Sequence, residues 1–182
     1  MQHTVGLLTF KSAIGHLEWL ANPVQKLIQN WSGKTPVEEI LAVQIDPAFA
    51  GSAEFCEKYG IQPNEGANCI IVKGKRGDLV KYAACLVPVD KRADINKTVK
   101  KYLEVRDISF APMDYAVEAS RMEYGSITVV GLPAEWPILI DRSLAEKEYL
   151  VVGGGLRSAK LLIPGKALAE LPNAFVIEDL GK

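Results

Sequence analysis

Two apolar segments on either side of a short glycine-containing turn constrain the fold more than any other feature of this sequence. Residues 67–73 read ANCIIVK, residues 79–89 read LVKYAACLVPV, and the segment KGKRGD leads from one to the other. Apolar runs separated by a glycine-rich turn are typical of two antiparallel strands. We therefore predict a β-hairpin over residues 67–89.

Helical and strand-like patterns follow one another irregularly along the rest of the chain. Val24, Leu27, Ile28 and Trp31 have the spacing of an amphipathic helix. Further helices are predicted at residues 53–59, after a Ser52 cap, and at 95–103, 113–121 and 166–171. Strands are predicted at residues 38–46, 107–111, 136–141, 149–152, 158–163 and 173–180. This order predicts an α+β fold with a mixed, mainly antiparallel sheet that curls or closes into a barrel and is flanked by helices.

Length and cysteine content bound the class of protein. The chain has 182 residues, enough for one compact domain. No apolar run approaches the roughly 18 residues of a membrane span, and the first residues lack a signal-peptide cleavage site. Three cysteines, an odd number, argue against a disulfide framework. We therefore expect a cytoplasmic protein without a membrane partner.

The charges are distributed unevenly although the net charge is only −1. Residues 73–106 contain ten Lys or Arg and four acidic residues, whereas the remainder of the chain is acidic. Such a segment is typical of a phosphate-binding face. It is equally typical of a solvated hairpin tip and helix face.

Several kinds of catalytic site are disfavoured by the residues present. His3 and His16 are the only histidines and the cysteines are not paired in spacing, so no metal site or cofactor is predicted. Gly153, Gly154 and Gly155 precede a predicted strand, whereas a nucleotide loop needs a helix there. A bend that allows backbone or ligand to approach closely fits these glycines better. Ser126 lacks the flanking glycines of a nucleophile elbow.

The segment RMEYGSITVVGLP, residues 121–133, allows two interpretations. It is either a β-strand with glycine ends or a loop whose exposed backbone amides contribute to chemistry. The ordered segments around it decide between the two. These are EKYGIQP, ANCIIVKG, LVPVDKRADINKTVKKYL, ISFAPMDYAVEASRMEYGSITVVGLP, WPILIDRSL and YLVVGGGLRSAKLLIPGKALAEL.

Together these segments resemble the YbaK/ProX family of aminoacyl-tRNA editing domains, which also occur inside some prolyl-tRNA synthetases. The resemblance covers roughly residues 39–180. It implies an editing-like domain over residues 39–182, with residues 1–38 as an N-terminal helical extension packed on that domain. It also implies hydrolysis, in trans, of the ester of a mischarged tRNA. The partners would be the aminoacylated acceptor end of tRNA and an aminoacyl-tRNA synthetase.

The resemblance also implies where the site lies. The family's loop has a glycine, three residues and a proline, and Gly125, Ser126, Ile127 and Thr128 match its first four positions. Its backbone amides would orient the reactants and stabilise an oxyanion. Val129 replaces the proline, which leaves the loop less fixed in φ.

Asn68 replaces a lysine that the family commonly has at the start of the strand at 67–73. The asparagine would contact the substrate through neutral hydrogen bonds. The replacement would then mean an altered amino-acid specificity, a positive charge supplied by Lys73 or Arg92 instead, or a loss of catalysis. Alternatively, Asn68 only caps a strand end. Gly153, Gly154 and Gly155 would allow close approach of the ligand. Arg157 and Lys160 would face the nucleotide end, or lie on an exposed strand edge.

Two other functions remain open at this stage. One is a catalytically inactive protein that binds a tRNA end or a nucleotide in the same pocket. The other is a protein-interaction role of the N-terminal helix through Trp19 and Trp31, although these side chains are expected to pack on the domain's own core.

Overall fold

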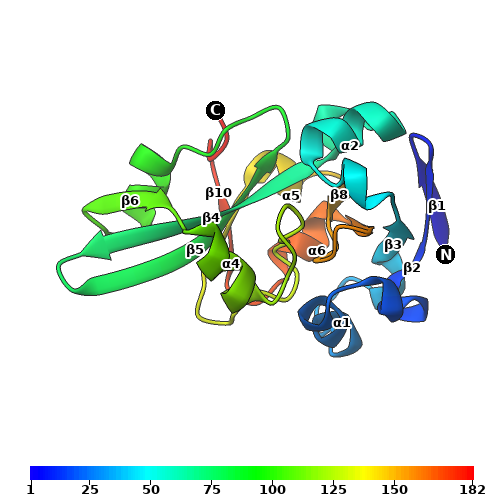
Figure 1. The fold of residues 1–182 in the computed structure, drawn as a ribbon, viewed down its shortest axis with the longest axis horizontal. Coiled ribbons are helices and arrows are strands. Elements are labelled where there is room, and N and C mark those ends of the chain that lie inside the picture. The colour runs from blue at the N-terminus through cyan, green and yellow to red at the C-terminus, as the bar shows by residue number, and fades with distance from the viewer.

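A computed structural model describes residues 1–182 as ten strands in two five-stranded sheets (Figure 1). The first sheet has the order β1-β2-β3-β9-β8 and is antiparallel throughout. Its strands are β1 (Gln2–Val5), β2 (Leu8–Ser12), β3 (Leu41–Gln44), β8 (Leu150–Gly153) and β9 (Ala159–Ile163).

The second sheet contains the predicted hairpin. Its order is β10-β7-β5-β4-β6, and β5 pairs with β7 and β7 with β10 in parallel. Its strands are β4 (Ala67–Arg76), β5 (Leu79–Pro88), β6 (Asp107–Phe110), β7 (Ile138–Asp141) and β10 (Ala174–Ile177). The β4–β5 register runs from Ala67 opposite Pro88 to Arg76 opposite Leu79, so the hairpin prediction is confirmed.

The two sheets meet where β4 begins. Gly66 forms an isolated parallel bridge with Val151 of β8, which joins the sheets into a curled, partly closed arrangement. Mixed pairing and curvature confirm the predicted fold class. A core of 27 buried residues fills the space inside, with smaller clusters of ten and nine on the outer faces.

Helices cover the edges and open sides of the curled sheets (Figure 1). They are α1 (Asn22–Gln29), α2 (Ser52–Tyr59), the π-helical segment η6 (Ile95–Val99) continuing into α3 (Lys100–Tyr102), α4 (Met113–Ser120), α5 (Arg142–Ala145) and α6 (Gly165–Ala169). Single 3₁₀ turns lie at Ala13–Gly15, Leu17–Trp19, Val37–Glu39, Pro47–Phe49 and Pro63–Glu65. No helix is long and apolar enough to cross a membrane.

The N-terminal segment contributes both a hairpin and a helix. Strands β1 and β2 were not predicted; β2 continues the first sheet by pairing with β3, and Phe10 is fully buried. Helix α1 places Val24 and Ile28 in the main core. The side chains of Trp19 and Trp31 also pack against that core.

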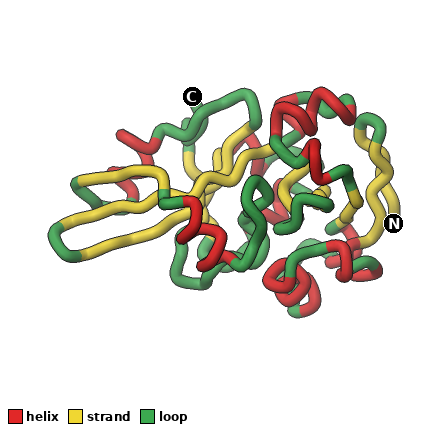
Figure 2. The backbone as a smooth tube through the Cα atoms, viewed as in Figure 1, coloured by secondary structure: helices red, strands yellow, loops and turns green.

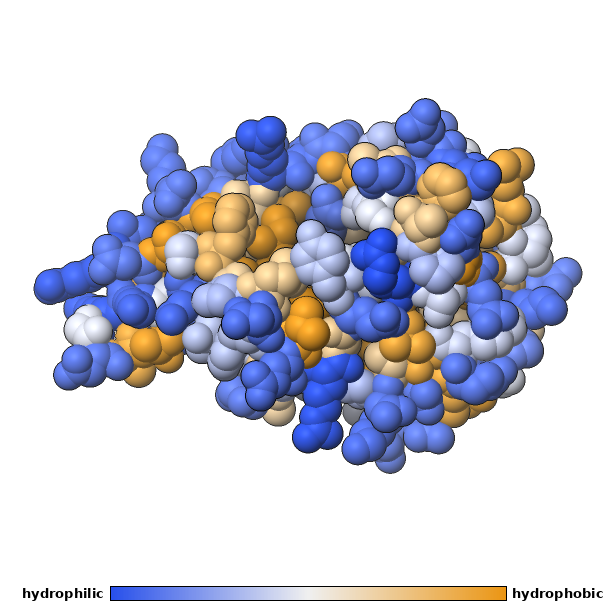
Figure 3. All heavy atoms as spheres, viewed as in Figure 1, coloured by the Kyte–Doolittle hydropathy of each residue, from blue (hydrophilic) through white to orange (hydrophobic).

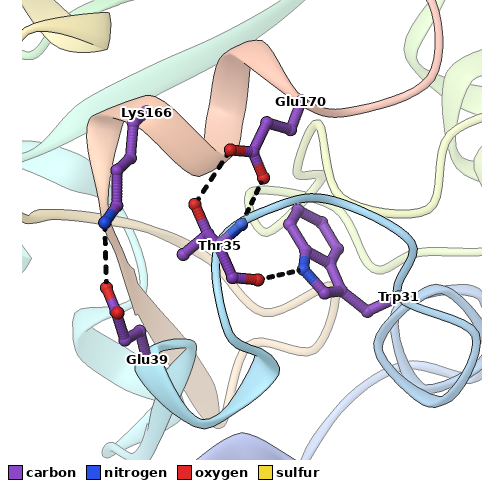
Figure 4. A network of polar contacts seen from close by, with 5 residues as sticks. All are labelled: Trp31, Thr35, Glu39, Lys166 and Glu170. Carbon is purple, nitrogen blue, oxygen red and sulfur yellow. Dashed lines mark hydrogen bonds and ion pairs between the residues drawn. The ribbon is translucent and has the colours of Figure 1, made fainter.

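A polar network joins the segment after α1 to the C-terminal helix α6 (Figure 4). Trp31 Nε1 donates to the Thr35 carbonyl at 2.7 Å. The Thr35 amide and hydroxyl donate to the Glu170 carboxylate at 2.9 and 3.0 Å, and Lys166 lies 3.4 Å from Glu39. Thr35 is buried, so these bonds satisfy polar groups that water cannot reach.

Candidate active site

Residues 121–137 form a loop between α4 and β7, not a strand (Figure 2). Helix α4 ends at Ser120, and its C-cap residue Arg121 has a left-handed φ of 56°. The chain then turns at Gly125, with φ of 76°, a conformation that glycine adopts without the strain of a Cβ. The loop interpretation of RMEYGSITVVGLP is therefore the one that the structure shows.

The backbone amides of this loop divide into two kinds. The Ser126 amide donates to the Glu123 carbonyl at 3.0 Å, and the Thr128 amide donates to Met122 Sδ at 3.3 Å. The amides of Gly125 and Ile127 have no hydrogen-bond acceptor within the protein. Within Gly125–Thr128, two N–H groups are thus left for another acceptor. The neighbouring amides of Tyr124, Val129 and Val130 also have no acceptor within the protein.

Arg157 fixes the loop from the side. Its Nη1 donates to the Tyr124 carbonyl and its Nη2 to the Pro47 carbonyl, each at 3.0 Å. A Cβ on Gly125 would lie 2.7 Å from Nη1. This guanidinium therefore links the loop, at Tyr124, to the 3₁₀ turn that begins at Pro47.

The three glycines of residues 153–155 differ in their surroundings. Gly153 lies against the loop, because a Cβ there would be 2.9 Å from the Ser126 carbonyl oxygen. Gly154 accepts a hydrogen bond from the Ala21 amide, and the Gly155 amide donates to the Ser126 carbonyl at 3.0 Å. The close approach predicted here is of backbone to backbone, and it seats the loop on β8 and α1.

A cavity of about 360 Å³ lies beside the loop, where the two sheets meet. Five of the predicted site residues line it: Gly125, Ser126, Ile127, Asn68 and Gly153. Its other lining residues are Gly51, Ser52, Ala67, Cys69, Ile70, Ile71, Phe110, Ala111, Met113, Ala116 and Lys160. The lining contains no acidic residue and no histidine.

The remaining predicted residues lie outside the lining of this cavity. Thr128 belongs to the loop and is fully buried. Gly154, Gly155 and Arg157 make the contacts described above, which hold the loop in place. Lys73 lies further along β4, opposite Ser109 of the edge strand β6. Arg92 lies beside the C-terminal residue Lys182, with which its backbone exchanges two hydrogen bonds. Neither Lys73 nor Arg92 thus supplies the charge of the cavity.

Asn68 presents an amide group to the cavity. Its Oδ1 accepts a hydrogen bond from the Ser52 hydroxyl, and its Nδ2 has no acceptor within the protein. Ser52 was predicted to cap α2, but the cap residue is Gly51 and the hydroxyl holds Asn68 instead. This bond orients the free NH₂ group as a donor in the cavity wall.

Lys160 is the cation of the cavity, and the alternative prediction that it lies on an exposed strand edge is wrong. Its side chain is only 7% exposed, and Nζ donates to the Ala50 carbonyl at 2.9 Å and lies 4.8 Å from the centre of the Phe55 ring. Burial lowers the pKa of this amine to about 8. Lys160 is directly opposite Gly153 in the β8–β9 pair, so the two residues face the same side of the sheet as the loop.

Two other polar groups in this region have unusual surroundings. The hydroxyl of Ser126 is buried without a hydrogen-bond partner, although the residue lines the cavity. Burial raises the pKa of the Cys69 thiol far above its usual range, so Cys69 is not a thiolate nucleophile at neutral pH. The cavity wall therefore consists of apolar side chains, neutral hydrogen-bond donors and one ammonium group.

Comparison with known proteins identifies the family. A family model described as an aminoacyl-tRNA editing domain matches residues 46–171. A crystal structure of a hypothetical protein, APE2540, is 22% identical, covers 88% of this chain and 100% of its own, and has a TM-score of 0.72. A proposed trans-editing enzyme for prolyl tRNA synthetase is 18% identical, covers 88% and 95%, and also has a TM-score of 0.72. The structural likenesses show a shared fold, and the family match covers more than half of the residues: the chain belongs to the aminoacyl-tRNA editing domain family.

Proposed function

We propose that this chain is a trans-acting deacylase that hydrolyses the ester of mischarged tRNA in the cavity beside Gly125. One observation supports this most strongly. The cavity wall offers hydrogen-bond donors from several elements: the free amides of Gly125 and Ile127, the Asn68 amide and the Lys160 ammonium. A wall of donors without an acidic residue is complementary to a carbonyl that gains negative charge.

The reaction needs little besides this arrangement. A water molecule attacks the ester carbonyl, and the carbonyl oxygen becomes an oxyanion that the donors stabilise. The bond from the carbonyl carbon to the ribose oxygen then breaks, the ribose oxygen takes up the proton that the attacking water gives up, and the amino acid leaves as the free acid. Removal of one oxyanion donor typically lowers kcat by about 10²–10³.

A second candidate is binding of an aminoacyl-tRNA end without hydrolysis. It is favoured by Asn68, which stands where the resemblance places a lysine and is held in place by Ser52. In this case the same donors would hold the ester in its ground state only.

The test uses purified protein and a panel of tRNAs charged with matched and mismatched amino acids. We expect loss of the ester from at least one mischarged tRNA in single-turnover reactions. Retention of the ester across the whole panel, with tRNA bound, would support the second candidate instead.

Gly125→Ala provides the mechanistic arm of this test. A Cβ at a left-handed φ, 2.7 Å from the Arg157 guanidinium, displaces the free amides, so we expect at least a hundredfold slower deacylation. Gly77→Ala is the matched control, because Gly77 has a similar φ of 63° in the hairpin turn with open space around it. Equal activity of the two variants would exclude the loop from the mechanism.

A further inference from the structure

One end of the molecule carries a concentration of cations that are not paired with carboxylates. We call it the basic surface; it consists of Lys73, Lys75, Arg76, Lys97, Lys100, Lys101 and Arg106. A groove between the hairpin and the η6–α3 segment is lined by five of them, together with Asn96, Glu104 and Val105. The Arg106 amide donates to the Lys75 carbonyl at 2.8 Å, which holds the two sides of the groove together.

The charges of this surface are not neutralised within the protein. None of the seven side chains forms an ion pair with a carboxylate. Glu104 and Asp107 are the acidic residues that line this region, and Asp107 stands opposite Lys75 in the β4–β6 pair without reaching it. Arg76 Nη1 donates to the Glu104 carbonyl at 3.4 Å, and Lys81 Nζ, in the same basic segment, donates to the Leu103 carbonyl at 2.9 Å; both bonds are to backbone and leave the positive charge unpaired. Clustered, unpaired cations repel one another, so their placement favours a polyanionic ligand.

The edge strand β6 connects the basic surface to the catalytic cavity. Phe110, at one end of β6, lines the cavity and is 65% exposed. The same residue lines a shallow depression with Lys73 and Lys75, and Arg106 precedes the other end of the strand. Four residues of strand span about 13 Å, a length along which a helical nucleic acid strand advances by roughly four nucleotides.

The surface view agrees with this path. Figure 3 shows a hydrophobic patch over β4 and β6 and a mostly hydrophilic end where the hairpin projects. An exposed aromatic ring next to a donor-lined cavity suits a base at the end of a strand, because bases stack on aromatic side chains. Lysines and arginines beyond it suit the phosphates that follow.

We propose that the basic surface binds the backbone phosphates of the tRNA acceptor arm, whose aminoacylated end enters the cavity along β6. This proposal rests on the proposed function for the identity of the nucleic acid. Phosphate contacts add affinity without reading sequence, so the surface positions any acceptor arm and leaves the choice of amino acid to the cavity.

The experiment compares two triple variants with the parent protein. Lys75→Gln, Lys101→Gln and Arg106→Gln together remove three exposed cations from three parts of the basic surface. Lys11→Gln, Lys26→Gln and Lys34→Gln remove three exposed cations near β2 and α1, at the opposite end of the molecule (Figure 1), with the same change in net charge.

The first readout is the affinity for uncharged tRNA as a function of salt. For the surface variant we expect at least tenfold weaker binding at about 0.1 M salt. The slope of log affinity against log salt concentration should correspond to about two to three fewer ions released on binding. The control variant should bind within twofold of the parent. Equal binding by all three proteins, or an equal loss in both variants, would overturn the proposal.

The second readout separates this proposal from the proposed function. With charged tRNA, the surface variant should show a raised KM and an almost unchanged kcat, whereas hydrolysis of an aminoacyl-adenosine should be unaffected. If the parent binds tRNA through this surface but hydrolyses no ester, the deacylase function fails and the surface assignment stands. If the surface variant loses kcat on the small ester as well, the residues act on the cavity and the surface assignment fails.

Discussion

At the scale of single residues, Lys160 makes the cavity sensitive to pH. Its pKa of about 8 lies below the ordinary value of 10.5 because burial disfavours the charged amine. Since the ammonium form is the one that stabilises an oxyanion, its contribution should decrease as pH rises through about 8. We predict that the ratio of kcat/KM between the parent and Lys160→Met falls between pH 7 and pH 9, measured as deacylation rates. A ratio that rises over this range would indicate that the neutral amine acts as a base.

The lowered pKa of Lys160 also predicts that the stability of the fold changes with pH. Between about pH 8 and pH 10.5 the unfolded chain binds a proton at Lys160 that the folded chain does not, so the free energy of unfolding increases with pH in this window. The increase is on the order of 3 kcal/mol. Urea denaturation of the parent and of Lys160→Met at both ends of the window measures it. An identical pH dependence in the two proteins would contradict the buried position of the amine.

Gly153 controls the fit between β8 and the loop. Gly153→Ala would place a methyl group 2.9 Å from the Ser126 carbonyl oxygen, and such overpacking costs about 1–3 kcal/mol. We predict this loss in urea denaturation together with slower deacylation, because the free amides move with the loop. Gly15→Ala, with no atom within 4 Å of the added Cβ, is the control and should be close to neutral. Parent-like values for Gly153→Ala would show that the loop is not seated on β8.

Residue types alone did not indicate this site. Gly125, Ser126, Ile127 and Asn68 were predicted from the resemblance to the editing-domain family, and the structure places all four at one cavity. Lys160 was also named, but its burial could not be predicted, because a lysine in a strand is usually exposed and only the β8–β9 pairing places it opposite Gly153. The separate role of Gly155 depends on its contact with Ala21, which no local pattern could indicate.

At the scale of elements, the N-terminal segment is expected to be required for folding. Leu8 and Phe10 of β2 and Val24 and Ile28 of α1 are buried in two different core clusters. Deletion of residues 1–38 should therefore yield a protein that is unfolded or aggregates, as seen by circular dichroism and gel filtration. Deletion of residues 1–4 removes only exposed positions of β1 and is the control. A cooperatively folding 39–182 fragment would instead make the segment an appended element.

The elements differ in how far they could be predicted. Helix α1 shows its buried face as periodic apolar residues, the β4–β5 hairpin shows two apolar runs around a glycine turn, and both were predicted. Strands β1 and β2 escaped because β1 exposes nearly all its side chains and β2 buries only two. The hydrophobic alternation on which strand prediction depends is therefore absent from β1, and in β2 it is limited to Leu8 and Phe10, too short to be distinctive.

At the scale of the whole molecule, the cavity exists because the two sheets meet. One sheet supplies Asn68 from β4 and the other supplies Gly153 and Lys160 from β8 and β9, while the loop after α4 closes the side. The fold class followed from the order of elements in the sequence. The junction could not, since it depends on the bridge between Gly66 and Val151, residues far apart in the chain.

The central claim is that the free amides of Gly125 and Ile127 bind the carbonyl of an aminoacyl ester. The most direct measurement is the ¹H–¹⁵N spectrum of labelled protein titrated with an aminoacyl-adenosine analogue whose ester is replaced by an amide. The account predicts that the amide protons of Gly125 and Ile127 move downfield as they gain an acceptor, and move further than those of Ser126 and Thr128, which already have one. Saturable binding that leaves the Gly125 and Ile127 signals in place would contradict it.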